Sequence, residues 1–326
     1  MRKPVFAAVV LFLLFTEAFA QSDSPDALRS QARALTVGDL LGLAESAGDG
    51  DIHSQLLLGV SYRLIAERDL AAAKNSGTYH LAAYWLRQAA DKGSAPAQYF
   101  LADLELDGPS VGLTFDCGEV SKLISNAVAQ QYLPAMIQLG HFYIVGGCGF
   151  KRDISTGLEW FRKASRAGYA NANYWLGRLY EEGREVRADQ REANRWFLKG
   201  ARMGDAACQD AIGISVAEGN GTRKNGPEAV QWFRKSAEQG NPNGACNLSI
   251  HYIRGEGIER DYVAALVWAL ISDRNITGGV YCLDHIEIPK LSKSQVAAAT
   301  QQANAWLTAH HYPTTAPPEY TEPKPD

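Results

Sequence analysis

The five cysteines are the side chains of this sequence that can take part in the widest range of reactions, and the first of them is residue 117. They are Cys117, Cys148, Cys208, Cys246 and Cys282. Cysteine thiols form disulfides, act as nucleophiles or bind zinc. Zinc sites usually contain closely spaced pairs of the type C-x-x-C, and no such pair is present. The sequence therefore predicts disulfides or buried thiols, and no metal site.

Two of these cysteines lie where a disulfide can join the ends of neighbouring helices. Cys117 directly follows Asp116, a residue type that caps the start of a helix. Cys148 follows the end of the next predicted helix. An antiparallel helix pair brings these two ends together, so we predict a Cys117–Cys148 disulfide. It closes a loop of about 30 residues, and such a bridge stabilises a fold by roughly 3–4 kcal/mol.

The other three cysteines leave alternatives open. Cys208 and Cys246 lie on neighbouring predicted helices and could pair, or both could be small buried apolar residues. Cys246 and Cys282 lie 36 residues apart, one period of the repeat described below. Equivalent helices of a repeat array stand about 8–10 Å apart, which is long for a disulfide. This distance disfavours a Cys246–Cys282 bridge, but the sequence does not decide which of the three are paired. The odd number leaves at least one thiol free or in an intermolecular link.

Motifs for catalysis and cofactor binding are missing from the sequence. There is no H-E-x-x-H, no P-loop and no glycine fingerprint for dinucleotides. The S-x-x-K of serine penicillin-recognising enzymes does not occur either. Ser215 has the spacing of a nucleophile elbow, but it falls within a predicted helix, whereas an elbow joins a strand to a helix. The sequence thus predicts a protein that is not an enzyme and has no cofactor.

Tryptophans recur every 36 residues and define the elements that carry these side chains. They are Trp160, Trp196, Trp232 and Trp268. A residue that can cap a helix stands seven positions before each: Asp153, Asp189, Asn225 and Asp261. A glycine stands eight positions after the first three, namely Gly168, Gly204 and Gly240, and glycine in a left-handed conformation ends helices. Each tryptophan therefore lies within a helix of about 14 residues, where we expect it to pack between helices.

A second helix follows each of these glycines after a short turn. One copy reads Tyr174-Trp175-Leu176-Gly177-Arg178-Leu179-Tyr180. A small residue follows Leu or Ile in each copy and allows close helix approach: Gly140, Gly177, Gly213 and Ser249. A glycine-containing loop then leads to the next cap. This order of helix, turn, helix and loop predicts an all-α protein, an α-solenoid of helix-turn-helix units.

These repeated phrases resemble the Sel-one-like repeat (SLR), a relative of the tetratricopeptide repeat. The family pattern is A-x-x-W-x-x-K-A-A-x-x-G-x-x-x-A-x-x-x-L-G-x-x-Y-x-x-G-x-G-V-x-x-D. Residues that match it include Ala82, Trp85, Ala89, Ala90, Gly93, Ala97, Leu101 and Gly108 in one copy, and Trp160, Lys163, Ala164, Gly168, Ala172, Leu176, Gly177, Tyr180, Gly183, Val186 and Asp189 in another. The resemblance implies a right-handed superhelix of about six to seven repeats over residues 37–288.

The resemblance also implies where a partner binds. In tetratricopeptide-like solenoids the first helix of the repeat, here the Leu-Gly helix, lines an inner groove. Carried over, two positions of each such helix face this groove: Tyr99 and Asp103, Ile137 and His141, Tyr174 and Arg178, Asp210 and Ile214. Aromatic, arginine and exposed apolar side chains are typical of binding hot spots. Ordinary surface and packing between repeats are the alternative for each of them. The implied partner is a protein or peptide.

The segments outside the repeats have distinct compositions. Residues 1–20 have a basic start, an apolar run and a small-residue cleavage site, which is typical of a secretory signal. Residues 21–36 can form an N-terminal helix that opens at Ser24-Pro25-Asp26. A capping box at Ser292 starts a capping helix within residues 289–310. The proline-rich residues 311–326 are expected to be disordered.

The first and least regular unit is expected at residues 37–47. Its helix resembles the tryptophan-type helices, with Leu40, Leu43 and Ala44 directed inward. The following residues 63–76 lengthen this unit, and Ala71-Ala72-Ala73-Lys74 indicates a longer helix.

The sequence places the protein outside the membrane and away from nucleic acid. No long apolar run follows the signal, so we expect no membrane insertion after cleavage. The formal net charge of −4 argues against a basic face for nucleic acid. We therefore expect a periplasmic or secreted scaffold that binds a protein or peptide. The alternatives are an enzyme acting on cell-wall or β-lactam-type ligands and a eukaryotic luminal adaptor.

Overall fold

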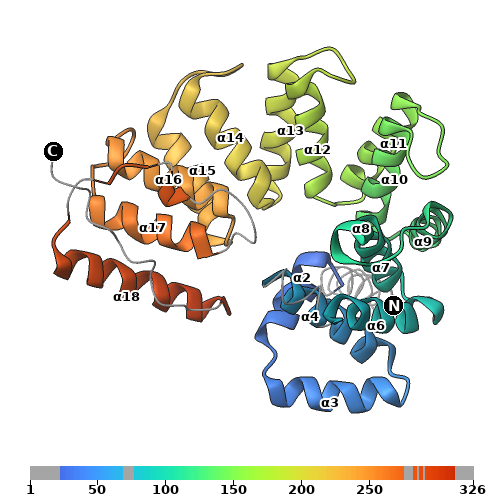
Figure 1. Cartoon of the computed structure of the whole chain (residues 1–326). Helices are drawn as coiled ribbons and strands as arrows, with labels where there is room; N and C mark the ends of the chain where they lie inside the picture. The colour runs from blue at the N-terminus through green and yellow to red at the C-terminus, as the bar shows by residue number, and fades with distance from the viewer. Residues whose placement is uncertain (1–22, 69–76, 275–281, 285, 289–290, 313–326) are drawn as a thin grey trace, which may run out of the picture. The chain divides into compact units, whose positions relative to one another are not determined.

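The computed structural model describes residues 23–68, 77–274, 282–284, 286–288 and 291–312, and it is helical (Figure 1). These residues contain no strand, which confirms the all-α prediction. The predicted signal at residues 1–20, residues 69–76 and nearly all of the proline-rich tail lie outside this part of the chain. No helix within it is long and apolar enough to cross a membrane.

The chain divides into two compact units, residues 1–160 and 161–326. Unit 1 contains α2 (Pro25–Ala34), α3 (Val37–Gly48), α4 (Ile52–Arg68), α6 (Thr78–Asp91), α7 (Ala95–Leu106), α8 (Gly108–Val111), α9 (Cys117–Ala129), α10 (Leu133–Val145) and the first half of α11 (Ile154–Arg166). Unit 2 contains the rest of α11, then α12 (Asn171–Glu182), α13 (Gln190–Arg202), α14 (Ala206–Glu218), α15 (Gly226–Glu238), α16 (Pro242–Arg254), α17 (Tyr262–Arg274), the 3-10 helix η1 (Cys282–Asp284) and α18 (Lys293–Ala309).

Consecutive helices pack as pairs, each with a first and a second helix. The pairs among the described residues are α4–α6, α7–α9, α10–α11, α12–α13, α14–α15 and α16–α17. Each second helix also packs on the next first helix, as α13 does on α14. This arrangement is that of an α-solenoid, as predicted. The short helix α8 is inserted in the loop of the α7–α9 pair.

The predicted caps and glycines set the bounds of these helices. Asp189 accepts hydrogen bonds from the backbone N–H groups of Arg191 and Glu192, both at 3.0 Å. Asp153, Asn225 and Asp261 cap their helices in the same way. Gly168, Gly204 and Gly240 have φ values of +94°, +96° and +82°. Gln131, which replaces this glycine in one unit, is held at φ +61°.

Phenylalanine is the fully buried aromatic residue of α11, α13 and α15. Phe161, Phe197 and Phe233 are at most 1% exposed, whereas the tryptophan before each is only half-buried. A Cβ added at Gly177 would lie 2.4 Å from the Phe197 ring, so the small residue makes room for this aromatic side chain. Trp160, Trp232 and Trp268 pack against the cores as predicted, but the most deeply buried residue is the phenylalanine that follows Trp160 and Trp232. Lys199 and Lys235 lie over the rings of Trp196 and Trp232, at 5.3 Å and 4.5 Å from the ring centroids.

A glutamine contact that was not predicted from the sequence joins the two helices at three of these turns. The Gln55 side-chain N–H donates to the carbonyl of Ala47 at 2.9 Å. Gln98 and Gln209 make the same contact eight residues back, to Ala90 and Ala201. Each bond satisfies a carbonyl at the end of one helix from the start of the next. The contact from Gln55 shows that α3 occupies the second-helix position of an N-terminal unit.

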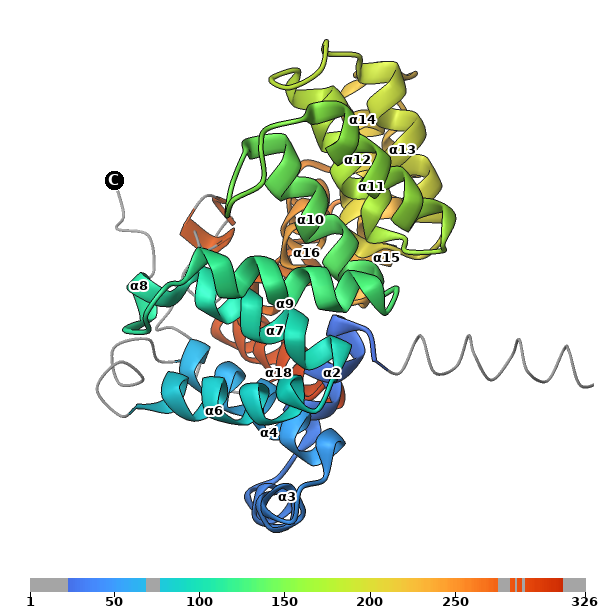
Figure 2. The ribbon, with the colours of Figure 1, turned by 90° about the vertical axis from the view of Figure 1, so that its right-hand side faces the viewer.

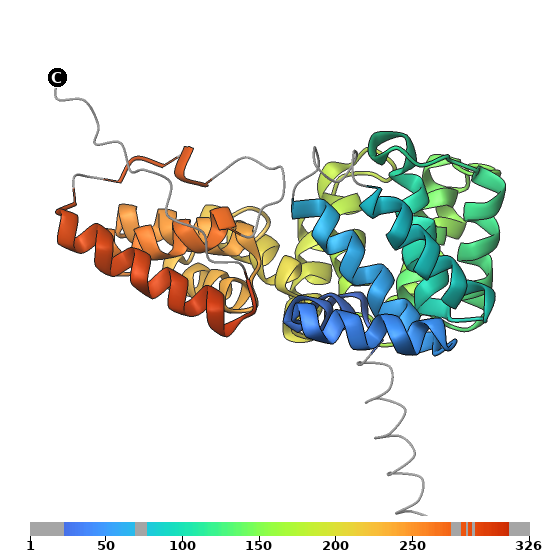
Figure 3. The same cartoon turned by 60° about the horizontal axis from the view of Figure 1, so that its bottom comes forward.

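The two ends of the array differ. In unit 2, α18 packs along α17 (Figure 3), with Ala299, Ala303 and Leu307 buried. Its capping box at Ser292 is present as predicted. In unit 1, α3 lies at the edge of the unit and packs against α4 (Figure 2). Ala47 is the one fully buried residue of α3. Of the three residues predicted to be directed inward, Leu43 packs against the core of unit 1, and Leu40 and Ala44 are half-buried.

Two disulfides are present among the described residues. Cys117 and Cys148 are joined, with a Cα–Cα distance of 4.6 Å. Cys246 and Cys282 are also joined, with 5.7 Å between Cα atoms. The expectation that the second pair is too far apart was wrong, because Cys282 lies in η1 and not on a helix equivalent to that of Cys246. Cys208 is a buried free thiol, so the alternative Cys208–Cys246 pairing does not form.

Candidate functional site

Four of the eight predicted groove residues lie on the first helices of unit 2. Tyr174 and Arg178 are on α12, and Asp210 and Ile214 are on α14. The helices α12, α14 and α16 pack next to one another. We call the surface that they form the first-helix face of unit 2. Tyr174 lies close enough to Arg178 and Asp210 to interact electrostatically with both, and Ile214 follows Asp210 by one turn of α14.

Tyr174 and Arg178 form an aromatic and cationic pair one turn apart. Arg178 donates to Glu181 at 2.9 Å and also to Glu182, and its side chain is 41% exposed. Partial burial works against its charge, but the phenol of Tyr174 and the two glutamates outweigh this, so the pKa of Arg178 is raised. Burial also raises the pKa of Tyr174. At neutral pH the pair therefore presents a neutral phenol beside a guanidinium.

Asp210 is the unusual group of this face, because its carboxyl is buried and its hydrogen-bond partner is an amide and not a cation. It is 6% exposed, and the Asn247 side chain of α16 donates to it at 2.8 Å. Burial raises the pKa of Asp210 to about 6, and the hydrogen bond from Asn247 opposes this only in part. The Asp210–Asn247 contact links the middle of α14 to α16.

Three further residues extend the face and were missed in the sequence reading. Trp175 is half-buried on α12, and its indole N–H donates to Asn171 at 3.0 Å. Asn247 is the partner of Asp210. Asn171 lies on α12 and Asn247 lies on α16. They occupy different positions of the repeat, so nothing in the sequence marked them as part of a site beyond their amide side chains. Ile214, 37% exposed, supplies an accessible apolar group beside them.

The other four predicted groove residues lie in unit 1, and α2 covers part of that face. Leu28 of α2 is fully buried in the core of unit 1. Arg29 lies over the ring of Phe100, 5.7 Å from its centroid, and the hydroxyl of Tyr132 donates to the carbonyl of Asp23 at 3.0 Å. Tyr99 lies beneath this helix, and burial raises its pKa to about 12. The chain's own N-terminal helix thus occupies the surface around Tyr99.

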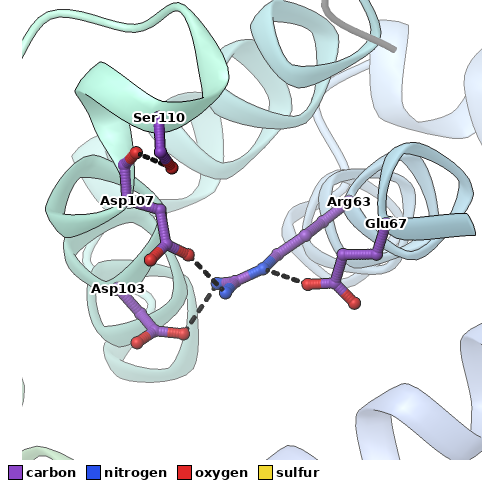
Figure 4. A network of polar contacts seen from close by, with 5 residues as sticks. All are labelled: Arg63, Glu67, Asp103, Asp107 and Ser110. Atoms are coloured by element: carbon purple, nitrogen blue, oxygen red, sulfur yellow. Dashed lines mark hydrogen bonds and ion pairs between the residues drawn. The ribbon is translucent and has the colours of Figure 1, made fainter. Parts of the chain in front are cut away.

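Asp103 is engaged in a network of ion pairs rather than presented to a partner. Arg63 of α4 donates to Asp103 at 2.7 Å, to Asp107 at 3.2 Å and to Glu67 at 2.9 Å (Figure 4). The Arg63 side chain is 9% exposed, so three carboxylates surround one buried guanidinium. The network joins α4 to α7, which is a structural role.

The last two predicted residues of unit 1 differ in burial. Ile137 is 5% exposed, and His141 is half-buried. Burial lowers the pKa of His141 to about 4, so this side chain is neutral at physiological pH.

The described residues offer little for catalysis. Burial raises the pKa of the Cys208 thiol, which keeps it protonated and unreactive. No group of three metal-ligating side chains occurs in the described part of the chain. Ser215, the candidate elbow residue, is buried within α14 and donates to the carbonyl of Ala211 at 3.2 Å. The first-helix face of unit 2 can bind through aromatic, cationic, amide and apolar contacts.

Comparison with known proteins supports the same conclusion about the repeats. A family model described as Sel1 repeat matches residues 53–94, 133–169, 170–205, 206–241 and 242–272. A Sel1 repeat protein from Oxalobacter formigenes is 27% identical, with a TM-score of 0.54, over 73% of this chain and 96% of that chain. The protective antigen c5321 of uropathogenic Escherichia coli, which displays an SLR fold, is 22% identical, with a TM-score of 0.40, over 84% and 72% of the two chains. A search of curated proteins finds no match.

Proposed function

Because the chain belongs to the Sel1 repeat family, whose members are typically scaffolds for protein interaction, we propose that it is an exported adaptor. It binds a protein or peptide through the first-helix face of unit 2. Its place of action is the periplasm or the extracellular medium.

The observation that carries this proposal is the set of side chains that α12 and α14 hold on one face. Tyr174 and Arg178 are partly exposed and held by packing and by Glu181 and Glu182. Ile214 lies on the neighbouring helix with 37% of its surface exposed. Tyrosine and arginine contribute most to binding where an ordered scaffold holds them in place, because little conformational entropy is then lost on association.

Export is supported by the disulfides. Cys117–Cys148 and Cys246–Cys282 lie in different units, and stable disulfides form in oxidising compartments such as the periplasm. The secretory signal expected at residues 1–20 agrees with this location.

Site-specific photo-crosslinking tests the proposal. A photoreactive amino acid is placed at Ile214, on the first-helix face, and separately at Gln231, an exposed position of the second helix α15. In the producing cell, the probe at 214 should crosslink one protein segment, identified by mass spectrometry, and the probe at 231 should not. Crosslinks of that segment to 231 and not to 214 would place the binding surface elsewhere.

A further inference from the structure

The helix α3 exposes apolar side chains to an unusual degree. Val37 is 77% exposed and Leu41 is 70% exposed. These two residues and Ala44 are spaced three or four apart, so they share one side of the helix. Leu40, Leu43 and Ala44 are half-buried, and Leu43 packs against the core of unit 1. The apolar surface of α3 is therefore wider than the part that α4 covers.

The position of α3 explains why this surface has no partner within the described residues. It holds the second-helix position of the N-terminal unit, as the Gln55–Ala47 contact shows. The preceding helix α2 packs on α4. Terminal units of repeat proteins normally present a polar outer face. The C-terminal helix α18 does so, with exposed Gln295, Gln301 and Gln302, but α3 does not.

The charges around this surface have one sign. No lysine or arginine occurs between Arg33 and Arg63, whereas this stretch contains Asp39, Glu45, Asp49 and Asp51. All four acidic residues are exposed. Lys92 of α6 reaches the end of this segment, where its ammonium donates to the carbonyl of Gly50 at 2.6 Å. The stretch between Arg33 and Arg63 therefore carries a net negative charge.

We propose that the apolar side of α3, made by the exposed Val37 and Leu41 with the half-buried Ala44 beside them, is a docking surface for a basic amphipathic helix of another protein. The apolar stripe accepts the apolar side of such a helix, in the manner of helix packing at the inner units. The surrounding carboxylates attract its lysine or arginine residues. A second copy of this chain is a poor occupant, because it would bring two acidic helices together.

A model peptide tests this surface directly. The probe is a fluorescein-labelled helix of leucine, alanine and lysine, about 18 residues or five turns long, and the control replaces each lysine by glutamate. Fluorescence anisotropy should show binding of the basic peptide to the wild-type protein, and the double variant V37S/L41S should bind it at least about tenfold more weakly. Glu45→Lys should also weaken binding. Val37, Leu41 and Glu45 are all exposed. Thermal melts of both variants, followed by circular dichroism, should therefore match that of the wild type.

The matched control lies on α6 of the same unit, where Leu81 is 44% exposed and Tyr84 is 53% exposed. The double variant L81S/Y84S should bind the basic peptide as the wild type does. Equal binding of the basic and acidic peptides, or unchanged affinity of V37S/L41S, would overturn the proposal. Sedimentation showing a dimer that V37S/L41S dissociates would overturn it as well, in favour of a second copy.

Discussion

At the scale of single residues, Asp210 is the group whose chemistry differs most from its ordinary behaviour. Its pKa is raised from 3.8 to about 6 by burial. Above pH 6 the folded protein carries a buried charge that costs stability. As the pH falls from 6 toward 4, the folded state binds a proton that the unfolded state does not, so the contribution of Asp210 to stability increases.

We therefore predict that Asp210→Asn stabilises the protein at pH 7 by up to about 3 kcal/mol. The amide still accepts the hydrogen bond from Asn247 and carries no charge. Urea unfolding at pH 7 and pH 4 should show this gain shrinking at the lower pH. A variant that is less stable than the wild type at pH 7 would show that the charge of Asp210 is compensated in the fold.

Gln131 is a second residue for which we predict a measurable loss of stability, because of its backbone conformation. It occupies a left-handed conformation at φ +61°, where the other units have glycine, and a side chain there costs about 1 kcal/mol. Gln131→Gly should stabilise the protein by about this amount. The reverse change Gly168→Gln, at φ +94° with no atom within 4 Å of the added Cβ, should destabilise it. Thermal unfolding of both variants measures the difference, and a shift of the same sign in both would contradict the interpretation.

The third prediction concerns Trp196 and Phe197, two adjacent residues of α13. Phe197 is fully buried against Gly177, so Phe197→Ala should cost about 3–5 kcal/mol. Trp196 is half-buried beneath Lys199, so Trp196→Ala should cost clearly less. Chemical denaturation of the two variants decides the order. A greater loss of stability for Trp196→Ala than for Phe197→Ala would show that the tryptophan contributes more to packing.

At the scale of the elements, α2 is the helix that the repeat pattern alone did not explain. Leu28 is fully buried by contacts within unit 1. Leu28→Ala should destabilise the protein by about 2–5 kcal/mol, whereas Leu41→Ala, at a 70% exposed site, should change stability by less than about 0.5 kcal/mol. Thermal melts measure both, and a small effect of Leu28→Ala would mean that α2 does not contribute to the core.

The elements also show what the sequence could and could not predict. Helix starts at Asp153, Asp189, Asn225 and Asp261 were predicted because a cap acts within three residues of its own position. The Cys246–Cys282 disulfide and the covering of Tyr99 by α2 were not, because each depends on where a segment outside the repeats returns in space. Among the groove residues, the sequence grouped Tyr174 and Arg178 correctly on one helix, but spacing alone did not reveal that Asp103 is bound to Arg63.

At the scale of the whole molecule, the central claim is that the first-helix face of unit 2 binds a protein or peptide. The most direct measurement is the affinity of the segment identified by crosslinking at Ile214, synthesised as a peptide, for variants of this face. Tyr174→Ala and Arg178→Ala should each weaken binding by about 1–3 kcal/mol while the melting temperature stays near that of the wild type. Wild-type affinity in both variants, together with a loss of binding when Gln231 is changed to alanine, would contradict the claim.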